Sequence, residues 1–182
     1  MNSAKRVFEN EIRFFDNDAH VDPRGIFKKL LRTTELESYK FENFFLTENF
    51  SRGTVRGLHF QVEPFSEYKM VSCVSGKIFD VVVDIRLKSA TFGTWAGYPL
   101  DASTNKSLLI PPGFAHGYQT LENNSNVFYA ISNQYSESHA RVITPNDSTL
   151  AIDWPLQIEL ISNRDSEGLT LIEYKAAGNQ SI

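Results

Sequence analysis

Two histidines lie where a side chain could carry out acid–base chemistry. His59 and His116 each fall in a β-like run, and each has a glycine close by, Gly57 before the first and Gly117 after the second. Glycine beside a strand residue commonly marks a bend or a close approach of backbone or ligand. A neutral imidazole can remove a proton that an adjacent carbonyl group makes acidic. Taken singly, each histidine is still better explained as a hydrogen-bonded structural residue.

A metal site is the first alternative for two such histidines. Zinc or iron in a small β-structure needs three or four N, O or S ligands, usually with a close pair such as His-x-His. The matching position after His59 is Gln61, and no glutamate follows at the usual short spacing within that run. The set is one ligand short, so we expect no metal. The other two histidines, His20 and His139, have polar neighbours and are predicted to lie on the surface.

Proton transfer through an enolate needs two groups besides a base. A cation or donor must stabilise the developing oxyanion, and a second proton carrier must act on the opposite face. Lys69 would share a strand face with Val71 and Cys73, which suggests either a function or a solvated strand start. Tyr129 would share a face with Tyr135, and a tyrosine there is core unless that face lines a cavity.

The composition bounds the class of protein. A chain of 182 residues, 41% of them hydrophobic, is long enough for one domain over residues 1–182, with a polar tail from about Glu173 that we expect to fray. The net charge is −4 and no Lys/Arg run exceeds two residues, so nucleic-acid binding is not expected. The single cysteine, Cys73, lies in an apolar run and is predicted to be a packing residue. No 18-residue apolar stretch occurs, so we expect no membrane span and a cytoplasmic protein.

Short β-rich runs between turn signals predict an all-β fold, a sandwich or a barrel. The predicted strands are Arg6–Phe15, Asn43–Glu48, Val55–Val62, Tyr68–Val74, Lys77–Ile85, Trp95–Leu100, Lys106–Ile110, Ala115–Thr120, Asn126–Gln134 and Ala140–Thr144. Helical periodicity is confined to Phe27–Leu36 and Thr149–Ile152.

The clearest predicted strand is Lys77–Ile85. Alternation places Phe79 and Val81 on one face and Asp80 and Asp84 on the other. The apolar face should pack in a core, whereas the two acids need solvent or a polar cavity. They could serve as strand-face hydrogen-bonding groups, or Asp80 could be a second polar partner near His59.

Motifs in register along the chain resemble the dTDP-4-dehydrorhamnose 3,5-epimerase family. They lie at residues 22–27, 55–61, 68–71, 76–86, 91–95, 110–117, 152–155 and 160–165. The resemblance implies a cupin-like jelly-roll β-barrel with a few short helices. It also implies a cofactor-free epimerase that inverts C3 and C5 of a nucleotide-linked 4-keto-6-deoxyhexose.

By the same resemblance, four residues carry the proton transfers. His59 is the base beside the C4 keto group, and Asp165 orients it and supports its charged form, as a carboxylate on the far ring nitrogen does. Lys69 stabilises the enolate oxygen, and Tyr129 returns a proton from the opposite face.

The resemblance further implies a set of substrate-binding residues, with arginine suited to a pyrophosphate. These are Arg24, Phe27, Asn49, Arg56, Gln61, His116, Tyr135 and Arg164. Arg56 and His59 have opposite parity on an ideal strand, so both reach one pocket only if the chain bends, for instance at Gly57. The family commonly forms homodimers in which an N-terminal strand and the Arg24–Phe27 segment complete the partner's site.

The chain departs from the family pattern at several positions. Lys29 replaces an acid, Thr47 replaces a glutamine, the loop Ser51–Thr54 is shorter, and the segment after Asp165, which usually carries a proline, reads Ser166-Glu167-Gly168-Leu169. The first three changes fall where the family contacts the nucleotide. A single-centre epimerase, or one acting on a CDP- or GDP-linked sugar, therefore stays an alternative. A metal-dependent cupin oxygenase and a non-catalytic sugar-nucleotide-binding module are rivals from other classes.

Overall fold

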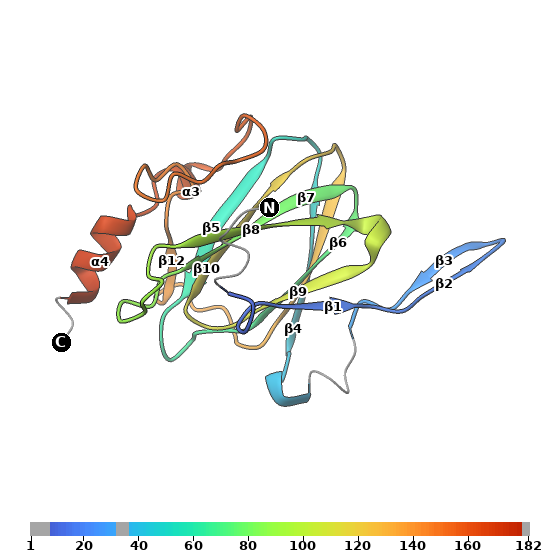
Figure 1. Cartoon of the computed structure of the whole chain (residues 1–182), viewed down its shortest axis with the longest axis horizontal. Helices are drawn as coiled ribbons and strands as arrows, with labels where there is room; N and C mark the ends of the chain where they lie inside the picture. Colours follow the sequence, from blue (N-terminus) through green and yellow to red (C-terminus); the bar gives the residue numbers. More distant parts are fainter. Residues whose placement is uncertain (1–7, 32–36, 180–182) are drawn as a thin grey trace.

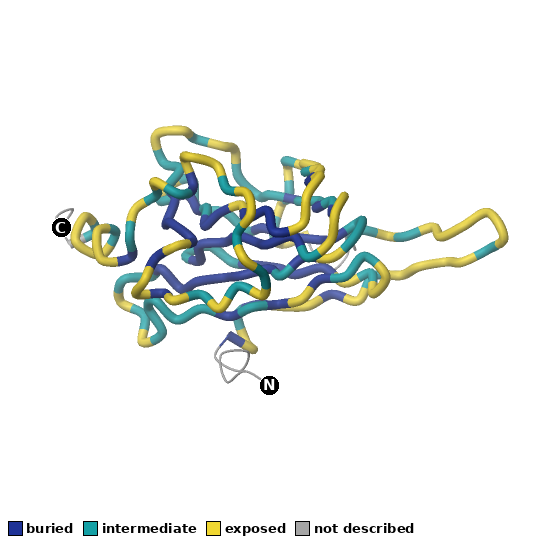
Figure 2. The backbone as a smooth tube through the Cα atoms, turned by 90° about the horizontal axis from the view of Figure 1, so that it is seen from above, coloured by how far each residue is buried: buried dark blue, intermediate teal, exposed yellow. Residues whose placement is uncertain are grey.

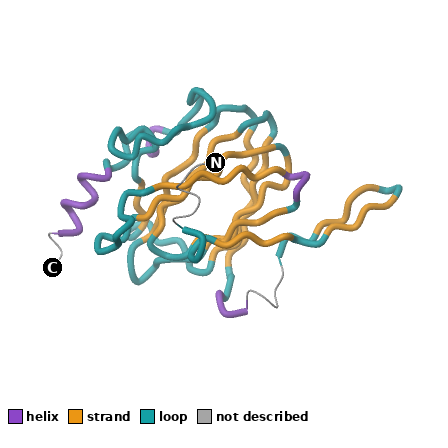
Figure 3. Tube along the Cα trace, in the orientation of Figure 1, coloured by secondary structure: helices purple, strands orange, loops and turns teal. Residues whose placement is uncertain are grey.

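Two five-stranded antiparallel sheets form the body of the molecule in the computed structural model, which describes residues 8–31 and 37–179 (Figures 1 and 3). One sheet has the order β1 (Arg13–Asp16), β9 (Lys106–Ile110), β6 (Lys69–Ser75), β11 (Ser125–Ile131) and β4 (Asn43–Asn49). The other has the order β12 (Ala140–Val142), β5 (Val55–Gln61), β10 (Phe114–Thr120), β7 (Lys77–Asp84) and β8 (Trp95–Asp101). The all-β prediction is confirmed. Pairing among the described strands leaves two separate sheets rather than one closed barrel.

The remaining elements are short. β2 (Ala19–Asp22) and β3 (Gly25–Lys28) pair only with each other, and their hairpin extends away from the sheets as an exposed arm (Figures 1 and 2). The helical elements are η1 (Glu37–Tyr39), η2 (Ala102–Thr104), α3 (Asn163–Ser166) and α4 (Leu171–Asn179).

Both faces of β7 are buried, which differs from the predicted division into one packed and one polar face. Ile78 and Val82 lie in the core between the two sheets, on the same face as Asp80 and Asp84. Val81 and Val83 pack on the outer face against residues that include Leu171 of α4. The outer face is covered because the chain after β12 folds back over this sheet. The two acids therefore point into the interior and need partners there.

Neither predicted helix is found among the described residues. Phe27 lies in β3, and residues 32–36 of the predicted Phe27–Leu36 helix fall outside the described part of the chain. Of Thr149–Ile152, the first two residues lie in a turn and the last two have no regular structure, and the Asp147 carboxylate accepts hydrogen bonds from the backbone N–H groups of Thr149 and Leu150 at 2.7 and 2.8 Å. An aspartate that binds the backbone two residues on favours a turn over a helix.

The described part of the polar tail, up to residue 179, is helical, whereas the sequence predicted fraying from Glu173. The Glu173 carboxylate accepts hydrogen bonds from the N–H and hydroxyl of Thr170, and the Thr170 hydroxyl accepts one from the Glu173 N–H. This reciprocal pair is a capping box that satisfies backbone donors at the first turn of a helix. Leu171 then anchors α4 in the outer core.

The predicted first strand, Arg6–Phe15, is shorter in the structure. Residues 8–12 form a turn before β1, and the positions before Phe8 lie outside the described residues. The Phe8 ring is buried edge-on against Phe114 of β10, with centroids 5.1 Å apart. An aromatic anchor thus fixes this turn on the second sheet.

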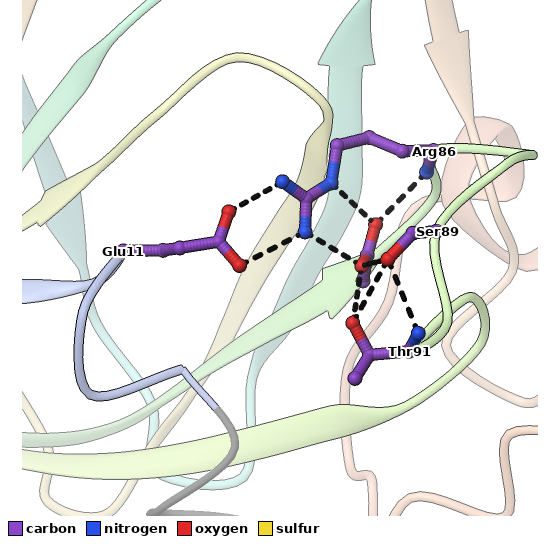
Figure 4. Close-up of polar contacts among 5 residues, drawn as sticks. Glu11, Arg86, Ser89 and Thr91 are labelled. Atoms are coloured by element: carbon purple, nitrogen blue, oxygen red, sulfur yellow. Dashed lines mark hydrogen bonds and ion pairs between the residues drawn. The ribbon is translucent and has the colours of Figure 1, made fainter.

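A polar network fixes the same turn (Figure 4). The Arg86 guanidinium donates to the carboxylates of Glu11 and Asp84, and the hydroxyls of Ser89 and Thr91 also donate to Asp84, at 2.5 and 2.6 Å. Burial raises the pKa of Asp84, but these hydrogen bonds outweigh it and lower that pKa to about 2. Asp84 is therefore a structural ion with its hydrogen-bonding capacity filled.

The pKa of Asp84 predicts how stability depends on pH. Because the folded-state value of about 2 lies below the unfolded value, the stabilisation is complete above pH ~4 and is lost as pH falls toward 2. Asp84→Asn should lower the free energy of unfolding at pH 7 by about 2 kcal/mol or more and flatten its dependence between pH 4 and 2. Urea unfolding at several pH values measures both effects.

Asp16→Asn is the matched control, since Asp16 is exposed and pairs with Lys106 at 3.2 Å on the surface. This substitution should leave the stability almost unchanged. Equal pH dependence in the wild type and Asp84→Asn would contradict the assignment.

Candidate active site

A cavity of about 390 Å³ lies where the β4–β11 edge of one sheet faces the β12–β5 edge of the other. Most of the predicted site residues line it: Arg56, His59, Gln61, Lys69, His116, Tyr129, Tyr135 and Arg164. Both sheets contribute, so segments far apart in the sequence meet there. Asp165 and Asn49 contact lining residues from behind, and Arg24 and Phe27 lie elsewhere.

His59 is held by a buried carboxylate. Its Nε2 lies 2.7 Å from Oδ1 of Asp165, and Oδ2 of Asp165 accepts a hydrogen bond from the Gly57 N–H at 3.1 Å. Burial raises the pKa of Asp165, but the hydrogen bonds from His59, Gly57 and Ser162 prevail and lower it. The ionised carboxylate therefore fixes the proton of His59 on Nε2 and leaves Nδ1 to accept another.

The chain bends at Gly57, as opposite parity requires if Arg56 and His59 are to share a pocket. On β10, His116 pairs with His59 but Tyr118 pairs with Arg56, so the register shifts between them. A Cβ added at Gly57, where φ is +123°, would lie 2.5 Å from the Gly117 Cα. Glycine is therefore needed at this crossing of the strands.

Lys69 is buried in the cavity wall and is not a solvated strand start. Its Nζ donates to the backbone carbonyl of His59 at 2.9 Å and pairs with Glu67 at 3.2 Å. The ammonium is thus held within reach of the same cavity as the imidazole. Cys73, farther along β6, packs in the core, and burial raises the pKa of its thiol to about 11. This confirms it as a packing residue.

Tyr129 lines the cavity from β11, which is in the same sheet as Lys69 and opposite the sheet that carries His59. Its ring lies edge-on to His116, with centroids 6.1 Å apart. Burial, together with Tyr118 and Asp80 nearby, raises the pKa of Tyr129 well above its usual value. The hydroxyl therefore keeps its proton at neutral pH and can act as an acid.

Asp80 pairs with His116 rather than His59, which corrects one of the two interpretations of this acid. Oδ2 of Asp80 lies 2.7 Å from Nε2 of His116, and both side chains are buried. Oδ1 of Asp80 has no hydrogen-bond partner among the described residues. Burial raises the pKa of Asp80, against the lowering effect of His116 and Lys69. A second histidine–carboxylate pair thus supports the cavity from within the core.

Two predicted ligand-binding residues, Asn49 and Gln61, have side chains that form hydrogen bonds within the protein. Asn49 is buried and does not line the cavity; its Oδ1 accepts from Arg56 Nε at 2.8 Å and from the Tyr118 hydroxyl at 3.2 Å. Its position suits orienting Arg56. Gln61 lines the cavity, but its amide nitrogen donates to Glu67 and to two backbone carbonyls, and its oxygen accepts from the Ser136 N–H.

Arg24 and Phe27 are not brought to this cavity. Both lie on the β2–β3 arm, where the Arg24 guanidinium pairs with Asp22 at 2.6 Å and the Phe27 side chain is 80% exposed. The arm projects beyond β1, because its two strands pair only with each other (Figure 1). A role in the site would need a second copy of the chain.

Three polar residues that the sequence did not single out also line the cavity, namely Glu67, Tyr118 and Arg141. Glu67 lies in the loop before β6, where no periodic pattern marks it. Arg141 lies in the weakest predicted strand, and only its pairing opposite Phe60 of β5 brings it to the site. Of the three, only Tyr118 could have been found from the sequence, because it directly follows the His116-Gly117 motif.

The structure describes residues 8–31 and 37–179. Within these ranges, no group of three or more His, Cys, Asp or Glu side chains is placed to hold a metal ion. No helix there has the length and apolarity to cross a bilayer. The expectation of a reaction without metal still rests on the sequence and stays a prediction.

Comparison with known proteins identifies relatives with the same architecture. The family model for dTDP-4-dehydrorhamnose 3,5-epimerase matches residues 10–173. The dTDP-4-dehydrorhamnose 3,5-epimerase of Shigella flexneri is 37% identical over 169 residues, covering 90% of this chain and 92% of the relative.

Solved structures agree with the sequence relatives. The RmlC epimerase of Mycobacterium tuberculosis superposes with a TM-score of 0.86 at 35% identity, over 93% of this chain and 88% of the other. ChmJ of Streptomyces bikiniensis, a 3'-monoepimerase in complex with dTDP-quinovose, gives a TM-score of 0.84 at 29% identity, over 92% and 87% of the two chains. The fold, the family model and the relatives all point the same way: the chain belongs to the dTDP-4-dehydrorhamnose 3,5-epimerase family of isomerases.

Proposed function

We propose that this chain inverts C3 and C5 of a dTDP-linked 4-keto-6-deoxyhexose by removing and returning protons through an enolate. The observation that carries the proposal is the placement of His59, Lys69 and Tyr129 around one cavity, with Asp165 behind His59. These groups supply a base, an oxyanion partner and an acid, which are the three requirements of the reaction.

The first step is proton abstraction beside the C4 ketone. Nδ1 of His59 takes the proton, and Asp165 stabilises the imidazolium that forms. The C–H electron pair moves into the enolate, and the negative charge on its oxygen is met by the Lys69 ammonium. A proton on the imidazolium can exchange with solvent before it returns.

The second step sets the configuration. Return of a proton from the side of His59 restores the original centre, whereas delivery by the Tyr129 hydroxyl from the other face inverts it. Tyr129 carries a proton to deliver, because its raised pKa keeps the hydroxyl protonated at neutral pH. The phenolate then regains a proton before the next turnover.

The cationic residues of the cavity suit a nucleotide diphosphate. Arg56, Arg141 and Arg164 line it, and guanidinium groups bind phosphate oxygens bidentately. The dTDP moiety is proposed from the names of the relatives. Thr47, one of the departures from the family pattern, also lines the cavity, so CDP- and GDP-linked sugars are the alternatives to test.

We further propose that the active form is a homodimer. The β2–β3 arm exposes Val21, Ile26 and Phe27, and β4, the edge strand beside the cavity, exposes Phe44 and Leu46. Exposed apolar side chains of this number favour burial against another protein surface. The arm of one copy could then place Arg24 and Phe27 at the cavity of the other. A cytoplasmic location stays a prediction from the sequence.

Solvent exchange tests the reaction and its substrate. Incubation with dTDP-4-keto-6-deoxyglucose in deuterated water should place deuterium at both C3 and C5, because the base passes its proton to solvent. Mass spectrometry and NMR of the sugar locate the label. Label at C3 alone would make the protein a 3-epimerase, and no label would eliminate this substrate; CDP- and GDP-linked sugars tested in parallel decide the nucleotide.

Two substitutions separate the roles of base and acid. His59→Ala should abolish exchange at both carbons, a loss of about a thousandfold or more for removal of a general base. Tyr129→Phe should retain part of the exchange but lose inversion at C5, because His59 still removes and returns protons on one face. Full inversion in Tyr129→Phe would show that another group delivers the proton.

A mixing experiment tests the exchange of arms between subunits. Arg24→Ala and His59→Ala should each be inactive alone, whereas a mixture allowed to exchange subunits should regain about a quarter of the wild-type sites, since half of a two-fold dimer population is mixed and each mixed dimer has one intact site. Activity and sedimentation of the mixture measure this. A dimer that recovers no activity would place Arg24 outside the partner's site.

A further inference from the structure

Glu67 is a buried acid of the cavity wall that the proposed reaction does not use. Its side chain is 9% exposed, and it lies two residues before Lys69, in the loop that leads into β6. Both carboxylate oxygens are engaged: Oε1 lies 3.2 Å from Lys69 Nζ, and Oε2 accepts from Gln61 Nε2 at 2.7 Å.

We propose that Glu67 is a positioning residue that holds the Lys69 ammonium in place for the enolate oxygen, a role that rests on the proposed function. Lys69 has a long, flexible side chain with three N–H donors. One donor reaches the His59 carbonyl at 2.9 Å, and the ion pair with Glu67 restrains the ammonium from a second side. A further donor remains for an oxygen in the cavity.

A hydrogen bond from Gln61 restrains the orientation of the Glu67 carboxylate. The Gln61 amide is itself held by the carbonyls of Phe65 and Gln134 and by the Ser136 N–H, at 2.7–3.1 Å. Its hydrogen bond to Oε2 therefore orients the carboxylate, which in turn presents Oε1 to Lys69. This assigns a use to Gln61 that does not require contact with substrate.

The charge of Glu67 has a second effect. Burying an ammonium costs much less free energy when a carboxylate lies beside it. Lys69 and Glu67 are 8% and 9% exposed, so little solvent screens the pair. The ion pair thus localises the ammonium before the enolate forms, which is the requirement for stabilising charge that develops only in the transition state.

The test is a double-mutant cycle between Glu67 and Lys69, read by deuterium incorporation. Glu67→Gln keeps the shape of the side chain and removes the ion pair. We expect kcat to fall about tenfold or more while KM changes by less than about twofold, since the enolate interaction is made only in the transition state. In a Lys69→Met background, Glu67→Gln should cost nothing further.

Two variants control for structure. Glu63→Gln alters an exposed glutamate of the same loop, bonded to the Ser66 hydroxyl, and should leave kcat unchanged. Glu67→Asp restores the charge and should recover part of the kcat lost in Glu67→Gln, a rescue that decides the question even if Glu67→Gln proves unstable in thermal melts.

The inference would be overturned if Glu67→Gln lowered kcat by the same factor in the wild-type and Lys69→Met backgrounds. It would also be overturned if Glu67→Gln left kcat unchanged or altered only KM. These results require a wild type that exchanges deuterium. A wild type that exchanges none would instead overturn the proposed function, and this inference with it.

Discussion

The close crossing of β5 and β10 at Gly57 and Gly117 is the constraint on which the site depends. No side chain fits between the two backbones there, since an added Cβ at Gly57 would lie 2.5 Å from Gly117. The bend turns Arg56 and His59 toward one cavity and directs the Gly57 N–H to the carboxylate of Asp165. One irregularity in a regular strand pair thus directs the proposed base and an arginine into one cavity, and holds the carboxylate that contacts this base.

The interior of this sandwich tolerates charge because four of its acids each lie against a basic side chain. Asp165 lies against His59, Asp80 against His116, Glu67 against Lys69, and Asp84 against Arg86. A buried acid without such a partner would be protonated or would destabilise the fold. Three of these pairs surround the cavity, whereas the fourth fastens the N-terminal turn at another part of the sheet (Figure 4).

The sequence predicted the strands well and the surroundings of the site less well. β-rich runs such as Lys77–Ile85 and Lys106–Ile110 match β7 and β9 closely, because strand-forming residues and the turns that bound them are local signals. The residues of β7 alone could not predict which of its faces lies between the sheets. The outer face is also buried, because the chain after β12 covers it. Pairings such as Asp80 with His116 and Glu67 with Lys69 likewise follow from strand register and loop path. The start of α4 was predictable from the sequence, because Thr170 and Glu173 have the spacing of a helix capping box. The prediction of a frayed tail did not take this pair into account.

The cavity is lined both by the interior strand β10 and by the edge strand β4, and the two strands differ in how well they can accept substitutions. Every residue of β10 is buried, and its side chains serve the core, the crossing of strands and the cavity together, so exchanges there disturb several functions at once. Thr47 lines the same cavity from β4, an edge strand that pairs with β11 alone among the described strands. Engineering for a new sugar or nucleotide therefore has a natural place to start at Thr47, which can be exchanged while the groups proposed to move protons keep their positions.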